Sequence, residues 1–169
     1  MDFRALFRFP NPVNETSARL VAAGVVVMSA SALVFDQLWL VAVIAFGFVA
    51  RVLTGPRLSP LAIVVTRLVT PRLPLHHRYV PGPPKRFAQG IGATISVAGV
   101  ISWYGLGSPI VTSALLGVLV VAATLESVFA ICLGCLVFAQ LMRLGVIPET
   151  VCEACANLWL DRDPARAHS

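Results

Sequence analysis

The strongest constraint on this chain is a series of long apolar runs that contain almost no charged side chains. Residues 20–35, 38–50 and 88–106 are apolar apart from Gln89 and small polar residues, and a fourth run extends from Ile110 almost to Ile147, interrupted by Glu126, Gln140 and Arg143. A helix needs about 20 apolar residues to cross the roughly 30 Å hydrocarbon layer of a bilayer. With 57% hydrophobic and 12% charged residues, the composition excludes an ordinary soluble domain and a disordered chain. We therefore expect an all-α polytopic membrane protein.

The apolar runs predict four transmembrane helices in one membrane domain that covers residues 1–169. The spans are expected over about 20–35, 38–52, 88–106 and 110–131. A secretory signal peptide is the alternative interpretation of the first run, because Ala30-Ser31-Ala32 resembles a cleavage site. A helical hairpin is favoured, since apolar sequence resumes at once and no soluble domain follows. After the fourth span we expect the chain to bend or emerge along the membrane face. A fifth span is the alternative, and it would send the C-terminus to the other side.

The distribution of positive charge predicts the orientation in the membrane. Seven of the 13 basic residues lie between the second and third apolar runs, namely Arg51, Arg57, Arg67, Arg72, Arg78, Lys85 and Arg86. Lysine and arginine near the ends of spans stay on the cytoplasmic side, and the loops around Gln37 and Ser108 contain neither. We expect a bacterial inner (cytoplasmic) membrane protein with both termini in the cytoplasm. No stacking aromatic residues are interleaved with these arginines, so nucleic acid is not expected as a partner.

The basic connection contains one short amphipathic pattern. Ser59-Pro60 predicts the start of a helix, and Pro71 predicts its end. Apolar residues follow one helical stripe at Leu61, Val64, Val65 and Leu68. Because about ten residues cannot cross a bilayer, we expect an amphipathic helix over about 60–70 on the inner membrane face. Arg57, Arg67 and Arg72 would then lie near lipid headgroups.

All four cysteines lie in two CxxC motifs in the last quarter of the chain. These are Cys132-Leu133-Gly134-Cys135 and Cys152-Glu153-Ala154-Cys155. Their spacing is typical of a tetrathiolate zinc site. Counting about 1.5 Å per residue from Ile110 places Cys132 roughly 33 Å along the helix, at the inner boundary. The rest of the chain, 132–169, is expected to be a cytoplasmic cysteine-containing tail, so that all four thiols can meet near the membrane.

Three interpretations of the cysteines remain open on spacing alone. They are buried thiols without chemistry, a zinc site, or a thiol–disulfide or sulfur-handling site. The reducing cytoplasm disfavours permanent structural disulfides and permits the last two. In the redox interpretation, Cys152 and Cys155 are expected to be exposed and to exchange with a partner, because exchange needs a reachable thiolate. Cys132 and Cys135 would receive electrons or sulfur nearer the membrane.

Glu126 is the only acidic residue inside an expected span, and such residues are usually paired or functional. It lies about 24 Å along its helix, and Arg51 lies about 20 Å along the second. We therefore expect Glu126 and Arg51 to form an intramembrane ion pair that joins two helices. A small transporter for a sulfur species, with this pair near its path, is a further functional alternative.

Several segments resemble a bacterial membrane-protein family that is frequent in actinobacteria, the domain of unknown function DUF4395. They are Pro81-Gly82-Pro83-Pro84-Lys85-Arg86-Phe87-Ala88-Gln89-Gly90-Ile91-Gly92, Phe129 to Cys135, Ile147-Pro148-Glu149 and Cys152 to Cys155. The resemblance covers about residues 10–158. It implies genes near those of thioredoxin-like proteins and thiosulfate sulfurtransferases, and so favours sulfur chemistry.

The functional hypothesis is therefore a thiol-redox or sulfur-handling membrane component with a thioredoxin-like or sulfurtransferase partner. The class alternative is a non-enzymatic subunit, in a homo- or hetero-oligomer, with a structural Zn²⁺ bound by Cys132, Cys135, Cys152 and Cys155.

Overall fold

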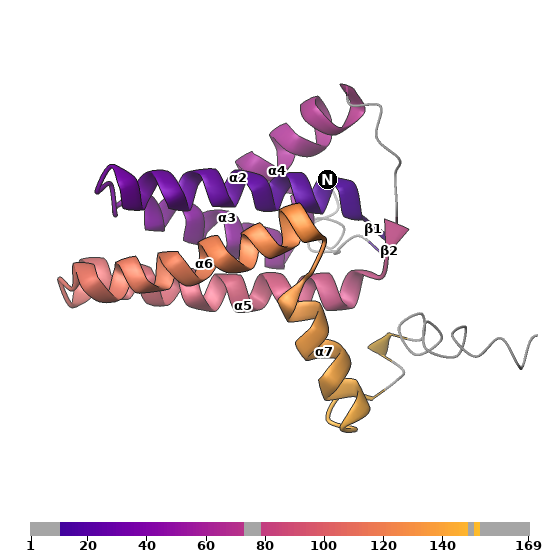
Figure 1. Ribbon diagram of the computed structural model, residues 1–169. Coiled ribbons are helices and arrows are strands. Elements are labelled where there is room, and N and C mark those ends of the chain that lie inside the picture. The colour runs from indigo at the N-terminus through magenta and orange to yellow at the C-terminus, as the bar shows by residue number, and fades with distance from the viewer. Residues whose placement is uncertain (1–10, 73–78, 149–150, 153–169) are drawn as a thin grey trace, which may run out of the picture.

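The computed structural model describes residues 11–72, 79–148 and 151–152 (Figure 1). Its helices are α2 (Glu15–Val34), α3 (Leu40–Thr54), α4 (Pro60–Val64), α5 (Gly82–Val100), α6 (Pro109–Phe129) and α7 (Leu133–Arg143). Shorter helical segments extend three of them: η1 (Gly55–Arg57) after α3, η2 (Val65–Val69) and η3 (Thr70–Arg72) after α4, and η4 (Ile101–Gly105) after α5. Strands β1 (Val13–Asn14) and β2 (Tyr79–Val80) pair antiparallel. The described fold is mostly helical, as the apolar runs predicted.

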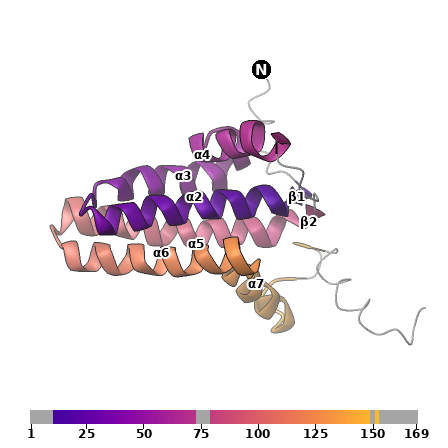
Figure 2. The same ribbon diagram turned by 45° about the horizontal axis from the view of Figure 1, so that its top comes forward.

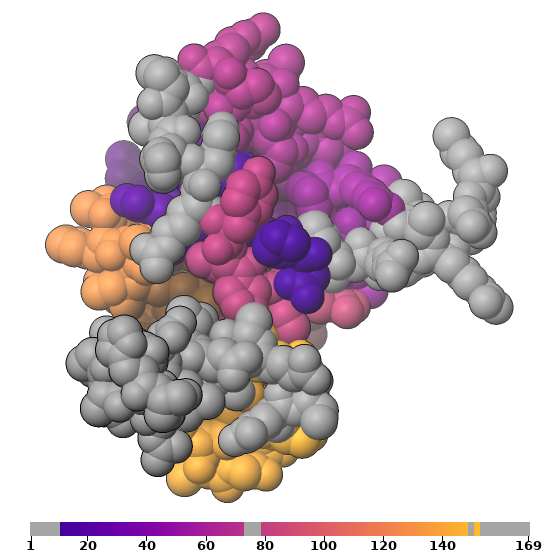
Figure 3. Space-filling view, turned by 90° about the vertical axis from the view of Figure 1, so that its right-hand side faces the viewer, coloured from indigo at the N-terminus to yellow at the C-terminus, as the bar shows by residue number. Residues whose placement is uncertain are grey.

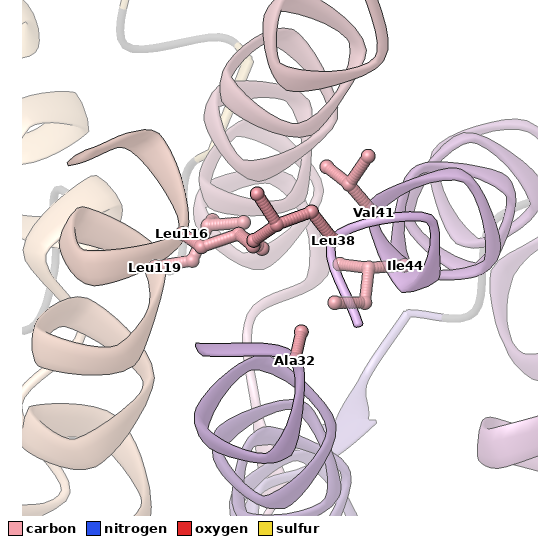
Figure 4. Close-up of a cluster of buried hydrophobic side chains, with 6 residues drawn as sticks. All are labelled: Ala32, Leu38, Val41, Ile44, Leu116 and Leu119. Carbon is pink, nitrogen blue, oxygen red and sulfur yellow. The ribbon is translucent and has the colours of Figure 1, made fainter. Parts of the chain in front are cut away.

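Four long helices form an antiparallel bundle, and α7 projects from one end of it (Figures 1 and 2). Helix α2 packs chiefly against α6, α3 packs chiefly against α5, and α5 also contacts α6. The largest core cluster draws on α2, α3, α6 and the turn between α2 and α3 (Figure 4). Its buried members are Ala32, Leu38, Val41, Ile44, Leu116 and Leu119. Because α3 neighbours α2 and α5, and α6 neighbours the same two helices, α3 and α6 are diagonal in the bundle. This order determines which charged side chains on different helices are close to each other.

Three described stretches are long and apolar enough to cross a membrane: Glu15–Val34, Leu40–Arg72 and Pro109–Phe129. Helix α5 is not among them, because it begins with glycine, prolines and two cations and continues with small residues. Membrane association is thus supported by three helices, and the four-span arrangement stays a prediction. The second stretch bends at Gly55, whose φ of 65° few other residues adopt, so that α4 leaves the bundle.

Local signals outside the apolar runs set two of the helix boundaries. Helix α2 begins at Glu15, before the expected span, because the Asn14 side chain accepts hydrogen bonds from the backbone N–H groups of Thr16 (3.0 Å) and Ser17 (3.4 Å). At the other end, α6 stops at Phe129, and Ala130 adopts a left-handed conformation with φ 58°. The chain therefore bends after the last span, and α7 begins three residues later.

Candidate functional site

The first CxxC motif lies at the start of α7, immediately after the turn that ends α6. Cys132 is the N-cap of α7, and its Sγ accepts a hydrogen bond from the backbone N–H of Cys135 at 3.4 Å. Both cysteines are free thiols; Cys132 is 9% exposed and Cys135 is partly exposed. Unpaired N–H groups and the helix dipole at this position favour negative charge on a sulfur atom. The motif therefore has the local geometry of a stabilised thiolate.

Close packing holds α7 against the first turns of α5. A Cβ on Gly134 would lie 2.5 Å from both the Cα and the Cβ of Ala88, so only glycine fits between the two helices. One turn further along α7, the ring of Phe138 packs on that of Phe87 with centroids 5.6 Å apart. The glycine inside the motif thus fixes the two cysteines beside the N-terminal end of α5.

That end of α5 forms a partly buried ion pair with α6. Lys85 Nζ lies 2.7 Å from Glu126 Oε1, and the two side chains are 8% and 24% exposed. Lys85 is one turn before Ala88, and Glu126 is in the last turn of α6, just before the turn that leads to Cys132. A cation and an anion therefore lie next to the motif.

The sequence suggested a different partner for Glu126, and the structure corrects it. Arg51 is 4% exposed, but its Nη1 donates to Ser59 Oγ at 3.4 Å, and its guanidinium lies 4.4 Å from the centroid of the Phe48 ring. The counted depths of Arg51 and Glu126 are similar. However, α3 is diagonal to α6, whereas Lys85 is on the adjacent helix α5.

Lys85 is the site residue that sequence reasoning missed, because it was counted only as one of the topology-setting cations. A signal was present, since Lys85 is the single lysine in a chain that otherwise uses arginine. A lysine presents a compact point charge, which fits a close pair with one carboxylate oxygen.

The two thiols of the first motif differ in acidity. A hydrogen bond from the Cys135 thiol lowers the pKa of Cys132, and the positive charge of Lys85 and the Cys135 backbone N–H act in the same direction. Burial and the negative charge of Glu126 oppose this change. The pKa of Cys135 is raised, because its proton is held in the bond to Cys132 and because the group is buried. Cys132 is therefore the more acidic thiol of the pair, and Cys135 is the thiol that retains its proton.

The second CxxC motif lies only in part within the described residues. Cys152 is 5% exposed and disulfide-bonded, so the expectation of an exposed Cys152 is corrected; Cys155 lies outside the described residues. The preceding Val151 lines a pocket of about 430 Å³ with residues from the start of α5 and from α7. These are Gly82, Pro83, Arg86, Phe87 and Phe138, together with Asn11. Figure 3 views the molecule from this end, with α7 (yellow) below the bundle and the segment Pro60–Arg72 (magenta) above it.

Within the described ranges, no group of three or more histidine, cysteine, aspartate or glutamate residues is arranged to hold a metal ion. The zinc alternative needs sulfur atoms from both motifs, and Cys155 of the second motif lies outside the described residues. The zinc site therefore stays a prediction.

Comparison with known proteins identifies a family. The family model described as Domain of unknown function (DUF4395) matches residues 13–143, which include helices α2 to α7 and the first CxxC motif. No curated protein and no solved structure matches the chain. Since the match covers more than half of the sequence, this chain belongs to the DUF4395 family.

Proposed function

We propose that this DUF4395 protein is a membrane-embedded thiol–disulfide exchange component, with Cys132 as the attacking sulfur and Cys135 as the resolving thiol. The observation that carries the proposal is the position of Cys132 at the N-cap of α7, where its sulfur accepts the Cys135 N–H. Two free thiols separated by two residues at a helix start, one poised as thiolate and one protonated, are the arrangement that exchange requires.

The proposed reaction transfers two electrons to a partner that carries a disulfide. The Cys132 thiolate attacks one partner sulfur, which forms a mixed disulfide and releases the other partner sulfur as a thiolate that takes up a proton. The Cys135 thiol then loses its proton and attacks Cys132 Sγ, which closes the Cys132–Cys135 disulfide and releases the second partner thiol. The protein dithiol is oxidised and the partner disulfide is reduced. A thioredoxin-like protein is the partner class that fits this chemistry.

The ion pair supports the proposal by its position beside the attacking sulfur. Lys85 favours the thiolate form of Cys132, and Glu126 holds the Lys85 side chain in place at 2.7 Å. Cys132 is 9% exposed, so a partner must approach at the turn between α6 and α7. Phe129 and Ile131 expose apolar surface at this turn, which gives a partner a contact area next to the thiol.

Trapping tests the assignment of roles. Cys135→Ser removes the resolving thiol, so membranes that contain this variant should accumulate a mixed disulfide through Cys132, seen on non-reducing gels and located by mass spectrometry. Cys132→Ser is the matched control and should trap nothing. A mixed disulfide in both variants, or in neither, contradicts the proposal.

The zinc alternative makes the opposite forecast on purified protein. Metal content and thiol number are measured on protein isolated without oxygen. Redox exchange predicts no stoichiometric metal and a change of two or four thiols between oxidised and reduced samples. One zinc per chain with four alkylation-resistant thiols would establish the structural site instead, because a closed tetrahedral site protects its ligands.

A further inference from the structure

The helical segment from Pro60 to Arg72, which comprises α4, η2 and η3, is attached to the outside of the bundle across α2 (Figures 1 and 2). Its inward side chains Ala62 and Val65 are 1% and 5% exposed and pack with Val21 of α2. Leu61 occupies the space that Gly24 leaves open, since a Cβ there would lie 2.6 Å from Leu61 Cδ1. The segment is therefore a packed element of the fold.

Polar contacts fix both ends of this segment. At its start, Ser59 is fully buried and accepts the hydrogen bond from Arg51 Nη1. At its far end, the hydroxyl groups of Thr70 and Ser17 form a buried hydrogen bond of 3.1 Å. With both ends held, the orientation of the outward face is set by the fold.

The outward face combines apolar and cationic side chains on one stripe. Val64 and Leu68 are 45% and 47% exposed, and Arg67 and Arg72 are also exposed. Positions 64, 67, 68 and 72 are exposed, whereas positions 62, 65 and 70 between and before them are buried, so these four side chains lie on the outward side of the segment. We call this set the outer stripe. The sequence predicted an apolar stripe here, but Val65 points inward while Val64 and Leu68 point outward.

Within the described residues, no acidic group compensates the charge of the outer stripe. In the described part of the chain, neither Arg67 nor Arg72 has a hydrogen-bond or ion-pair partner. The sequence contains no aspartate or glutamate between Asp36 and Glu126. An external anion is therefore the natural partner for these two guanidinium groups.

We propose that the outer stripe lies in the headgroup layer of the membrane and binds anionic phospholipid. The segment runs from Leu61, which packs at Gly24 halfway along α2, to Thr70, which is bonded to Ser17 near the start of α2. Its arginine-bearing end therefore lies level with the start of α2, where an apolar span leaves the hydrocarbon. Exposed Val64 and Leu68 fit the boundary with the acyl chains, and arginine side chains reach phosphates with bidentate hydrogen bonds. A soluble anion in water would bind the two arginines but would not explain why Val64 and Leu68 are exposed beside them. This surface is independent of the thiol site.

A local fluorescent probe tests the proposal. The full chain, with an environment-sensitive fluorescent amino acid in place of Leu68, is reconstituted into phosphatidylcholine vesicles that contain a small fraction of phosphatidylglycerol. Nitroxide-labelled versions of the two lipids are then compared as quenchers. Both should quench the probe, and labelled phosphatidylglycerol should be enriched around it. A cation near an anionic surface is worth about 1 kcal/mol, so each arginine should contribute about fivefold to this enrichment.

Charge variants separate specific binding from general attraction. Arg67→Gln with Arg72→Gln should remove the enrichment, whereas Arg67→Lys with Arg72→Lys should retain most of it. Arg143→Gln, which removes an exposed cation at the last residue of α7, should leave the enrichment unchanged. Enrichment that survives the double glutamine variant, or falls equally in Arg143→Gln, overturns the proposal. So does a probe that iodide quenches from water while neither lipid does. A probe protected from all quenchers would place a protein on the face, which also overturns it.

Discussion

At the residue scale, two charges of opposite sign act on one thiol. Lys85 stabilises the Cys132 thiolate, whereas Glu126 destabilises it, although the two side chains are 2.7 Å apart in one ion pair. A structural role of the Lys85–Glu126 pair can therefore be distinguished from an electrostatic effect of its charges on Cys132. Loss of either partner disrupts the same pair, but the two losses change the charge next to the sulfur in opposite directions.

We predict opposite shifts in the pH dependence of Cys132 alkylation. Lys85→Met removes the cation, which raises the pKa of Cys132, so the alkylation rate should rise only at higher pH than in the wild type. Glu126→Gln removes the anion and lowers that pKa, so the rate should rise at lower pH. Each shift should be on the order of one pH unit. The rate is followed at the Cys132 peptide by mass spectrometry.

Misfolding would change the pH dependence of Cys132 alkylation in a different way, and this difference serves as the internal control. A variant that opens the site alkylates faster at every pH, and both variants would do so because both lose the ion pair. Shifts of the same sign in Lys85→Met and Glu126→Gln would show that the charges do not act on Cys132.

The residue types of the site could be read from the sequence, but their pairing could not. The spacing of Cys132 and Cys135 identifies a pair that shares one helix start, because that geometry is local. The partner of Glu126 depends on which helices are adjacent. Arg51 and Lys85 are both basic residues at the same end of the bundle, and only the order of helices around the bundle selects Lys85.

At the element scale, the site depends on how closely α7 approaches α5. We predict that Gly134→Ala destabilises the protein by about 1–3 kcal/mol, because its Cβ would overlap Ala88 and push the helices apart. Gly90→Ala in α5 is the matched control, since a Cβ at that position would meet no atom within 4 Å and alanine favours a helix. The free energy of unfolding is measured in detergent micelles by titration with a denaturing detergent.

The same pair of variants checks the link between packing and chemistry. Displacement of α7 should also make Cys132, which is 9% exposed, easier to alkylate in Gly134→Ala than in Gly90→Ala. Equal stability of the two variants would contradict the close approach of α5 and α7.

Element boundaries were predictable only where hydrophobicity decides them. The apolar runs locate α2, α3 and α6, but polar capping at Asn14 extends α2 beyond its apolar part. The face of the segment Pro60–Arg72 was not predictable either. In a membrane protein an exposed valine or leucine faces lipid at little cost, so apolar periodicity does not tell which side is buried. Packing of Ala62 and Val65 against Val21 decides it.

At the scale of the whole molecule, the antiparallel bundle separates charge between its two ends. The turns after α2 and before α6 form one end, and the described residues there include no lysine or arginine. The starts of α2 and α5, the ends of α3 and α6, the far end of the segment Pro60–Arg72, and α7 lie at the other end (Figure 1). That end carries the basic residues, the ion pair and the first CxxC motif. The positive-inside rule then predicts that the thiol site lies on the cytoplasmic side.

This orientation predicts the outcome of topology mapping. Single cysteines at Gln37 and Leu106, in a background with the native cysteines replaced by serine, should react with an impermeant maleimide added outside intact cells. Cysteines at Arg72 and Leu144 should react only after the membrane is opened. All four positions are exposed, so a lack of reaction reports the compartment rather than burial. External labelling at Leu144 would require a further crossing by the segment after α6. External labelling at Arg72 would show that the bundle has the opposite orientation in the membrane. The thiol site would then be out of reach of the proposed cytoplasmic thioredoxin-like partner.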